Sequence, residues 1–161
     1  MAKDTVVGES AEEITDALLA ASRLLVAMSA RSIALVDESI TIPQFRTLVI
    51  LSTQGPSKVV TLAQSLNVQP STAARMVDRL VTAGLVNRKP NPDSRRELII
   101  ELTMLGHRVV DRVTDHRRGE IATVVERMSE RDRSGLVRAL TAFTNAGGEP
   151  QFGFDIDSYQ L

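Results

Sequence analysis

The chain has 161 residues, of which 43% are hydrophobic, and a formal net charge of −1. This length predicts one structural domain with a single core, and the near-neutral charge argues against nucleic-acid binding over the whole surface but not by a local basic patch. The absence of cysteine excludes disulfides, thiolate metal sites and thiol redox switches. No segment approaches the run of about 20 apolar residues that a membrane span needs, and the polar N-terminus does not resemble a secretory signal, so we expect a cytoplasmic protein without a membrane partner.

A long helix is predicted over residues 10–38, and Thr41 caps the next one. Ser10 and Glu13 form a capping box at the start of the long helix. Apolar residues then recur in alternating steps of four and three, at Ile14, Leu18, Ala21, Leu25 and Met28. Such a helix would be about 43 Å long, whereas a compact chain of this size has a radius of gyration of about 15 Å. We therefore expect its apolar face to overhang the domain and pack on a partner; the alternative is a core helix packed only within its own chain.

A helix-turn-helix is predicted over residues 61–84. A turn at 67–69 separates a short helix from a longer one. Pro70 suits the first position of the longer helix, because no backbone hydrogen bond is lost there, and Gly84 suits its end. One face of this helix is apolar, with Ala73, Val77, Leu80 and Val81. The other face is polar, with Ser71, Thr72, Arg75, Asp78, Arg79 and Thr82.

A β-hairpin, or wing, is predicted directly after this helix. Residues 85–89 form its first strand, 90–94 are dense in turn-forming residues, and a second, half-buried strand has inward positions at Leu98, Ile100 and Leu102. Val59–Val60 would add a short third strand. Between positions 75 and 96 there are six basic and two acidic residues, so the helix and wing form a local basic region in a chain whose total charge is −1.

Two further helices are predicted after the wing. Thr103 caps a long one whose apolar positions are Leu105, Val109, Val113, Ile121, Val124, Val125 and Met128. Its polar middle, residues 114–120, predicts a kink or a wet patch. A last helix runs from Ser129 to Gly147-Gly148. Residues 149–161 have aromatic residues without periodicity, so this tail is either disordered or docks its aromatic side chains on a dimer.

These motifs, in this order, resemble the winged helix-turn-helix of the MarR family of transcriptional regulators. The resemblance extends over residues 10–146. Its segments are Thr61-Leu62-Ala63 with Leu66, Pro70-Ser71-Thr72 with Arg75, Val77-Asp78-Arg79-Leu80, Ala83-Gly84-Leu85-Val86, Asp93-x-Arg95-Arg96, Leu102-Thr103-x-x-Gly106 and, upstream, Thr41-Ile42-Pro43-Gln44-Phe45 to Leu51.

The resemblance implies a mostly α fold with a two- to three-stranded β-wing. Residues 10–38 and 104–146 would be dimerisation helices and 41–103 the DNA-binding lobe, within one structural domain. It also implies a homodimer that binds a pseudo-palindromic site in double-stranded DNA, usually as a repressor, without a cofactor. In many members a small aromatic or anionic effector releases the DNA; here its cleft would involve Phe45, Arg46 and His107.

The candidate DNA-binding residues come from the recognition helix and the wing. On the helix they are Gln69, Pro70, Ser71, Thr72, Arg75 and Arg79. Hydroxyls suit phosphate or base contacts, and an arginine such as Arg75 can bind guanine O6 and N7 together; Arg79 instead bonds either Asp93 or a phosphate. The resemblance places Arg95 in the minor groove, with Asp93 holding the wing. Arg88, Lys89 and Arg96 are expected on phosphates. The alternative is an ordinary solvated helix face.

Catalysis and metal binding find no support in the sequence. His107 and His116 are the two histidines, and a spacing of nine residues on one helix does not place them on a shared face. Phosphate-binding glycine loops and nucleophile elbows are absent. We therefore expect no enzyme activity and no metal. The competing function is a helical dimer whose winged domain binds another protein.

Overall fold

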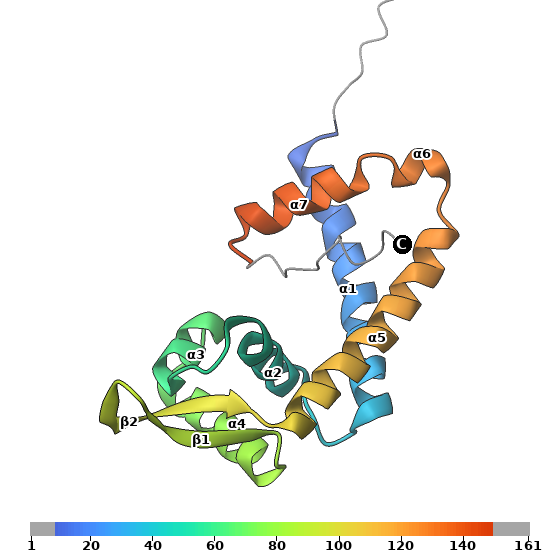
Figure 1. Ribbon diagram of the computed structural model, residues 1–161. Coiled ribbons are helices and arrows are strands. Elements are labelled where there is room, and N and C mark those ends of the chain that lie inside the picture. The colour runs from blue at the N-terminus through green and yellow to red at the C-terminus, as the bar shows by residue number, and fades with distance from the viewer. Residues whose placement is uncertain (1–8, 150–161) are drawn as a thin grey trace, which may run out of the picture.

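The computed structural model describes residues 9–149, except for the side chain of Arg95. Within these residues there are seven helices and one two-stranded hairpin (Figure 1). The elements are α1 (Ala11–Val36), α2 (Ile42–Gln54), α3 (Val59–Leu66), α4 (Pro70–Thr82), β1 (Val86–Asn91), β2 (Ser94–Leu102), α5 (Met104–Glu126), α6 (Glu130–Arg133) and α7 (Leu136–Ala146). The mostly α fold with a small β-wing is thus as predicted.

Helix boundaries follow the predicted capping residues. The Ser10 hydroxyl accepts from the Glu13 backbone N–H at 3.2 Å, and the Glu13 carboxylate accepts from the Ser10 N–H at 2.8 Å. Those bonds from Ser10 lower the pKa of Glu13. Pro70 opens α4, Asn67 makes the preceding turn with a left-handed φ of 53°, and Gly84 follows α4 with a φ of 72°.

The helix-turn-helix and the wing form one lobe with the N-terminal half of α5. Side chains from each of these elements meet in a single core, and the most deeply buried are Leu48, Leu62, Val77, Leu80, Leu85, Ile100 and Val113. Ile33, near the end of α1, joins the same core. The lobe therefore holds α4 and the hairpin in a fixed relation to the two long helices.

The wing differs from the prediction at two places. Val59–Val60 does not form a third strand but opens α3; the contact with the hairpin comes from Ser57, whose backbone pairs with Ile100 at 2.9 and 2.8 Å. Leu98 is exposed, not inward. It pairs with Pro90 close to the turn of the hairpin, and the hairpin extends beyond the helices of the lobe (Figure 1). Burial on β2 is therefore confined to its base.

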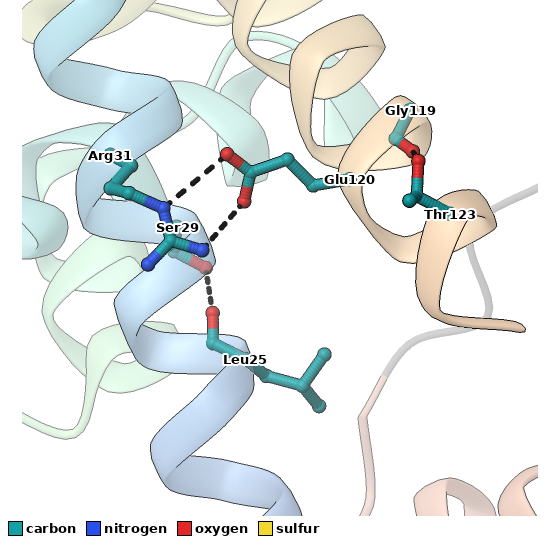
Figure 2. A network of polar contacts seen from close by, with 6 residues as sticks. All are labelled: Leu25, Ser29, Arg31, Gly119, Glu120 and Thr123. Carbon is teal, nitrogen blue, oxygen red and sulfur yellow. Dashed lines mark hydrogen bonds and ion pairs between the residues drawn. The ribbon is translucent and has the colours of Figure 1, made fainter. Parts of the chain in front are cut away.

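The long helices α1 and α5 cross and are joined by an ion pair. The Arg31 guanidinium donates to both oxygens of Glu120, at 3.4 and 3.0 Å, and Figure 2 shows the two side chains reaching across from α1 and α5. The polar middle of α5 does not interrupt the helix. It instead lines a surface depression of about 530 Å³ with, among the described residues, Arg112, Asp115, His116, Gly119, Glu120 and Thr123.

The C-terminal helical region is less continuous than predicted. Ser129 does cap a helix, but α6 ends at Arg133 and α7 begins only after Gly135, whose φ of 78° breaks the helix. Val137 on α7 is 80% exposed, and Leu105 at the start of α5, predicted to be inward, is exposed as well. The predicted tail lies outside the described residues, apart from Glu149.

One helix of the described chain, α1, is long and apolar enough to cross a membrane by length and composition. The expectation that no segment reaches that limit was wrong. Alanines between the larger apolar side chains raise the mean hydropathy, although Arg23 and Arg31 interrupt the run. A helix that packs on another protein chain can have the same composition, so this criterion alone does not indicate a membrane.

Candidate nucleic-acid interface

The outer face of α4 carries the predicted contact residues. Ala73, Val77 and Leu80 are buried against the lobe, which leaves Ser71, Arg75 and Arg79 exposed on the opposite side. Thr72 is half-buried. Gln69 and Pro70 are exposed at the start of the helix, and the Gln69 side chain makes no capping bond. A row of hydroxyl, amide and guanidinium groups thus lies along one side of the helix.

Two of the basic wing residues are already paired with carboxylates. Arg88 on β1 donates to Asp78 on α4, and Lys89 pairs with Glu101 across the hairpin. A phosphate would have to compete with these acids. Among the described side chains of α4 and the wing, Arg75, Arg79 and Arg96 form no such ion pair, so these three are open to an external anion. Arg95 lies in β2 directly before Arg96.

The turn of the wing is held by residues that were not predicted to belong to the site. Asp93 donates its backbone N–H to the Asn91 side-chain oxygen at 3.0 Å, and the Asn91 amide donates to Glu97 at 3.1 Å. Lys58, directly before α3, also donates to Glu97, at 2.6 Å. The Asp93 side chain is exposed and pairs neither with Arg79 nor with any other described cation. Two features of the sequence could have indicated these residues: Asn91 lies in the turn-forming segment, and Glu97 directly follows Arg95 and Arg96.

The predicted effector residues are not gathered in one pocket. Phe45 is buried in the core, His107 is exposed on the first turn of α5, and Arg46 forms a 3.0 Å ion pair with Glu149. A depression of about 360 Å³ lies beside that pair and is lined by Arg46, Val49, Ile50, Thr53, Gln54, Gln64, Ser65, Gly147, Gly148 and Glu149. Neither Phe45 nor His107 reaches it. No cluster of three or more potential metal ligands occurs among residues 9–149.

A helix-turn-helix followed by a basic wing, carried on long helices, defines a winged helix-turn-helix protein. The family model described as "MarR family" matches residues 40–98. The crystal structure of RV1404 from Mycobacterium tuberculosis is similar to the chain with 66% identity and a TM-score of 0.82, covering 90% of this chain and 99% of that one. The chain belongs to the MarR family of transcriptional regulators.

Two further relatives extend this comparison. The transcriptional repressor NicR of Pseudomonas putida is 37% identical over 75 residues, which are 47% of this chain and 48% of the repressor. The chain thus spans about half the length of this curated relative. Wild-type apo MarR from Escherichia coli has the same fold, with a TM-score of 0.68, 22% identity and coverage of 80% and 95% of the two chains.

Proposed function

We propose that the protein is a homodimeric repressor in the cytoplasm that binds a pseudo-palindromic site in double-stranded DNA. The observation that carries this proposal is the exposed polar face of α4, where Arg75 and Arg79 have no carboxylate partner among the described residues. The width of the major groove admits such a helix, with Gln69, Pro70, Ser71 and Thr72 nearest its N-terminal end. The name of the NicR relative supports repression.

The dimer would be built from residues 10–38 and 104–146, with 41–103 as the DNA-binding lobe. Leu25 and Leu35 on α1 and Phe143 on α7 are large apolar side chains left exposed in the single chain. A second copy covering them would remove this apolar surface from water and place two recognition helices on one DNA face. The overhang of α1 beyond its own lobe supports the same arrangement (Figure 1).

A small aromatic or anionic effector would act by favouring a dimer whose recognition helices no longer fit the operator. Arg46 already holds the Glu149 carboxylate beside a depression, so it is placed to hold an external carboxylate in the same way. Phe45 and His107 would contribute only if the second copy or the effector rearranged this region. The effector must bind the DNA-incompetent dimer more tightly, because equal affinity for both states shifts nothing.

Sequence selection from random duplexes, followed by a search of the gene's own upstream region, tests the DNA-binding function. A pseudo-palindromic consensus supports it. The competing function, a dimer whose winged domain binds another protein, is favoured if no sequence is enriched. Exposure of unpaired arginines on one side of α4 supports DNA over that alternative, because a phosphate backbone needs accessible cations.

Arg75→Ala is expected to weaken operator binding by about 1–3 kcal/mol and to relax preference at one base position in each half-site. The reason is loss of two hydrogen bonds to a guanine edge. The measurement is a titration against operators mutated at each position. Arg131→Ala on α6, which lies at the opposite end of the molecule from α4 in Figure 1, removes the same charge. It should leave the base preference at each operator position unchanged. Uniform weakening of every sequence by Arg75→Ala would contradict direct base reading.

Arg95→Ala is expected to weaken binding to all operator variants and to lower the salt slope by about one unit per wing. A minor-groove cation responds to groove width, so preference should change only in the flanking A·T content. Arg95→Lys should recover part of the affinity, because the charge remains. Titrations at several salt concentrations measure both effects. A change confined to one major-groove position would instead show that the wing reads a base edge.

A further inference from the structure

A side-chain contact between the wing and the start of α3 runs through the Glu97 carboxylate. Glu97 receives the Lys58 ammonium at 2.6 Å and the Asn91 amide at 3.1 Å on the same oxygen, Oε2. Lys58 immediately precedes α3, and Asn91 ends β1 where the strand register shifts. Glu97 therefore links the first helix of the helix-turn-helix to the turn of the wing.

The same linkage reaches the tip of the hairpin. Asn91 is buried, and its side-chain oxygen fixes the backbone N–H of Asp93 at 3.0 Å. Glu97 lies directly after Arg95 and Arg96 on β2, and Asn91 precedes them on the other side of the turn, so the bond between Glu97 and Asn91 spans the segment that carries both arginines. The nearest backbone bond between the hairpin and the rest of the lobe is the Ser57–Ile100 pair, three positions further from the tip. Beyond that pair, side chains must hold the wing.

We propose that Glu97, through Lys58 and Asn91, is a positioning residue that sets the wing against the recognition unit and thereby fixes how this protein reads the flanks of its operator. This inference rests on the proposed DNA-binding function. The Lys58 ammonium and the Asn91 amide both hold the pKa of Glu97 below its usual range, so the carboxylate stays charged at neutral pH.

The chain contains a matched comparison for this role. Glu101 lies on the same strand and also pairs with a lysine, but its partner Lys89 is on β1, inside the hairpin. Glu97→Gln and Glu101→Gln each remove one negative charge and release one lysine. Only Glu97→Gln weakens the contact with Lys58, the residue directly before α3. A purely electrostatic effect on DNA would therefore be similar in the two variants, whereas a positioning effect would differ.

The experiment measures affinity for two versions of the selected operator that differ only in A·T-rich or G·C-rich flanks. In Glu97→Gln we expect the ratio of the two affinities, A·T-rich over G·C-rich flanks, to fall about two- to fivefold toward one. This is the size of effect that the loss of one half-exposed ion pair produces. Glu101→Gln should keep the wild-type ratio. The double variant Lys58→Glu with Glu97→Lys restores the ion pair with reversed polarity and should recover part of the ratio, but not all of it, because a lysine cannot accept from the Asn91 amide.

The outcomes separate this inference from the function on which it rests. If the wild-type protein selects no duplex, the DNA-binding function fails and this inference fails with it. If the wild type selects an operator but Glu97→Gln keeps its flank ratio, or shifts it no more than Glu101→Gln does, only the positioning role is overturned. Equal loss in the charge-reversed double variant would also overturn it, because restoring the pair would then have no effect.

Discussion

A variant carrying Leu18→Glu and Leu25→Glu is expected to be monomeric and to lose operator binding. Leu25 is 43% exposed and Leu18 is half-buried, so neither belongs to the closely packed core of the single chain. In a dimer seam the same positions would bury four carboxylates without partners. An unpaired buried charge costs several kcal/mol, so dimerisation should weaken by more than about 100-fold.

Sedimentation analysis and operator titration on the same samples measure this result. The control is Thr15→Glu with Ser22→Glu, which places two charges at the same spacing on exposed polar positions of α1. The hydroxyls of these residues donate to backbone carbonyls of their own helix, Ala11 and Leu19. The control should stay dimeric and bind DNA. A folded, monomeric leucine variant with normal operator affinity would rule out the dimer as the binding species.

Gly106→Ala is expected to destabilise the fold by about 3 kcal/mol, at the upper end of the usual range for overpacking. A Cβ at Gly106 would clash with the Leu85 carbonyl oxygen and lie 3.0 Å from Leu102 Cδ2. That oxygen also accepts from the Thr103 N–H at 3.0 Å, and the Thr103 hydroxyl bonds to Gly84. The backbone at Gly84 and Leu85 is thus held by two hydrogen bonds from Thr103. It cannot move away from an added Cβ without breaking these bonds between the segment after α4 and the start of α5.

Thermal unfolding provides the measurement, and a loss of this size should lower Tm by on the order of 10 °C. Gly119→Ala on the same helix is the matched control, because no described heavy atom lies within 4 Å of an added Cβ there. This control should be slightly stabilising, since alanine is favoured over glycine inside a helix by about 0.5–1 kcal/mol. Equal Tm changes in the two variants would contradict the close packing at Gly106.

The order of elements and the candidate interface follow from short-range patterns. Ser10 with Glu13, Pro70 and Gly84 mark helix ends through backbone needs that are met within a few residues. The hydroxyl-and-arginine face of α4 follows from helical spacing alone. The family and the mostly α, winged fold are accordingly confirmed, whereas the individual DNA and effector contacts stay predictions.

The errors occur where long-range packing decides. The exposure of Leu98 and Leu105 and the place of the strand contact at Ser57 depend on how the elements meet in the folded chain. The interruption at Gly135 is different, because its positive φ is a local feature of the backbone. A sequence period describes which residues share a face. It does not specify whether another element covers that face, so apolar periodicity overestimated burial on both the wing and α5.

Ion pairing in the wing also depends on the tertiary structure. Local charge identifies the region from Arg75 to Arg96 as basic, because side-chain types and spacing are enough for that conclusion. Only the folded chain pairs Arg88 with Asp78 and joins Lys58 to Glu97, leaving Arg75 and Arg79 without such partners in the described chain. The physical reason is that an ion pair needs two side chains within about 4 Å, and those side chains come from different elements that meet only when the core has formed.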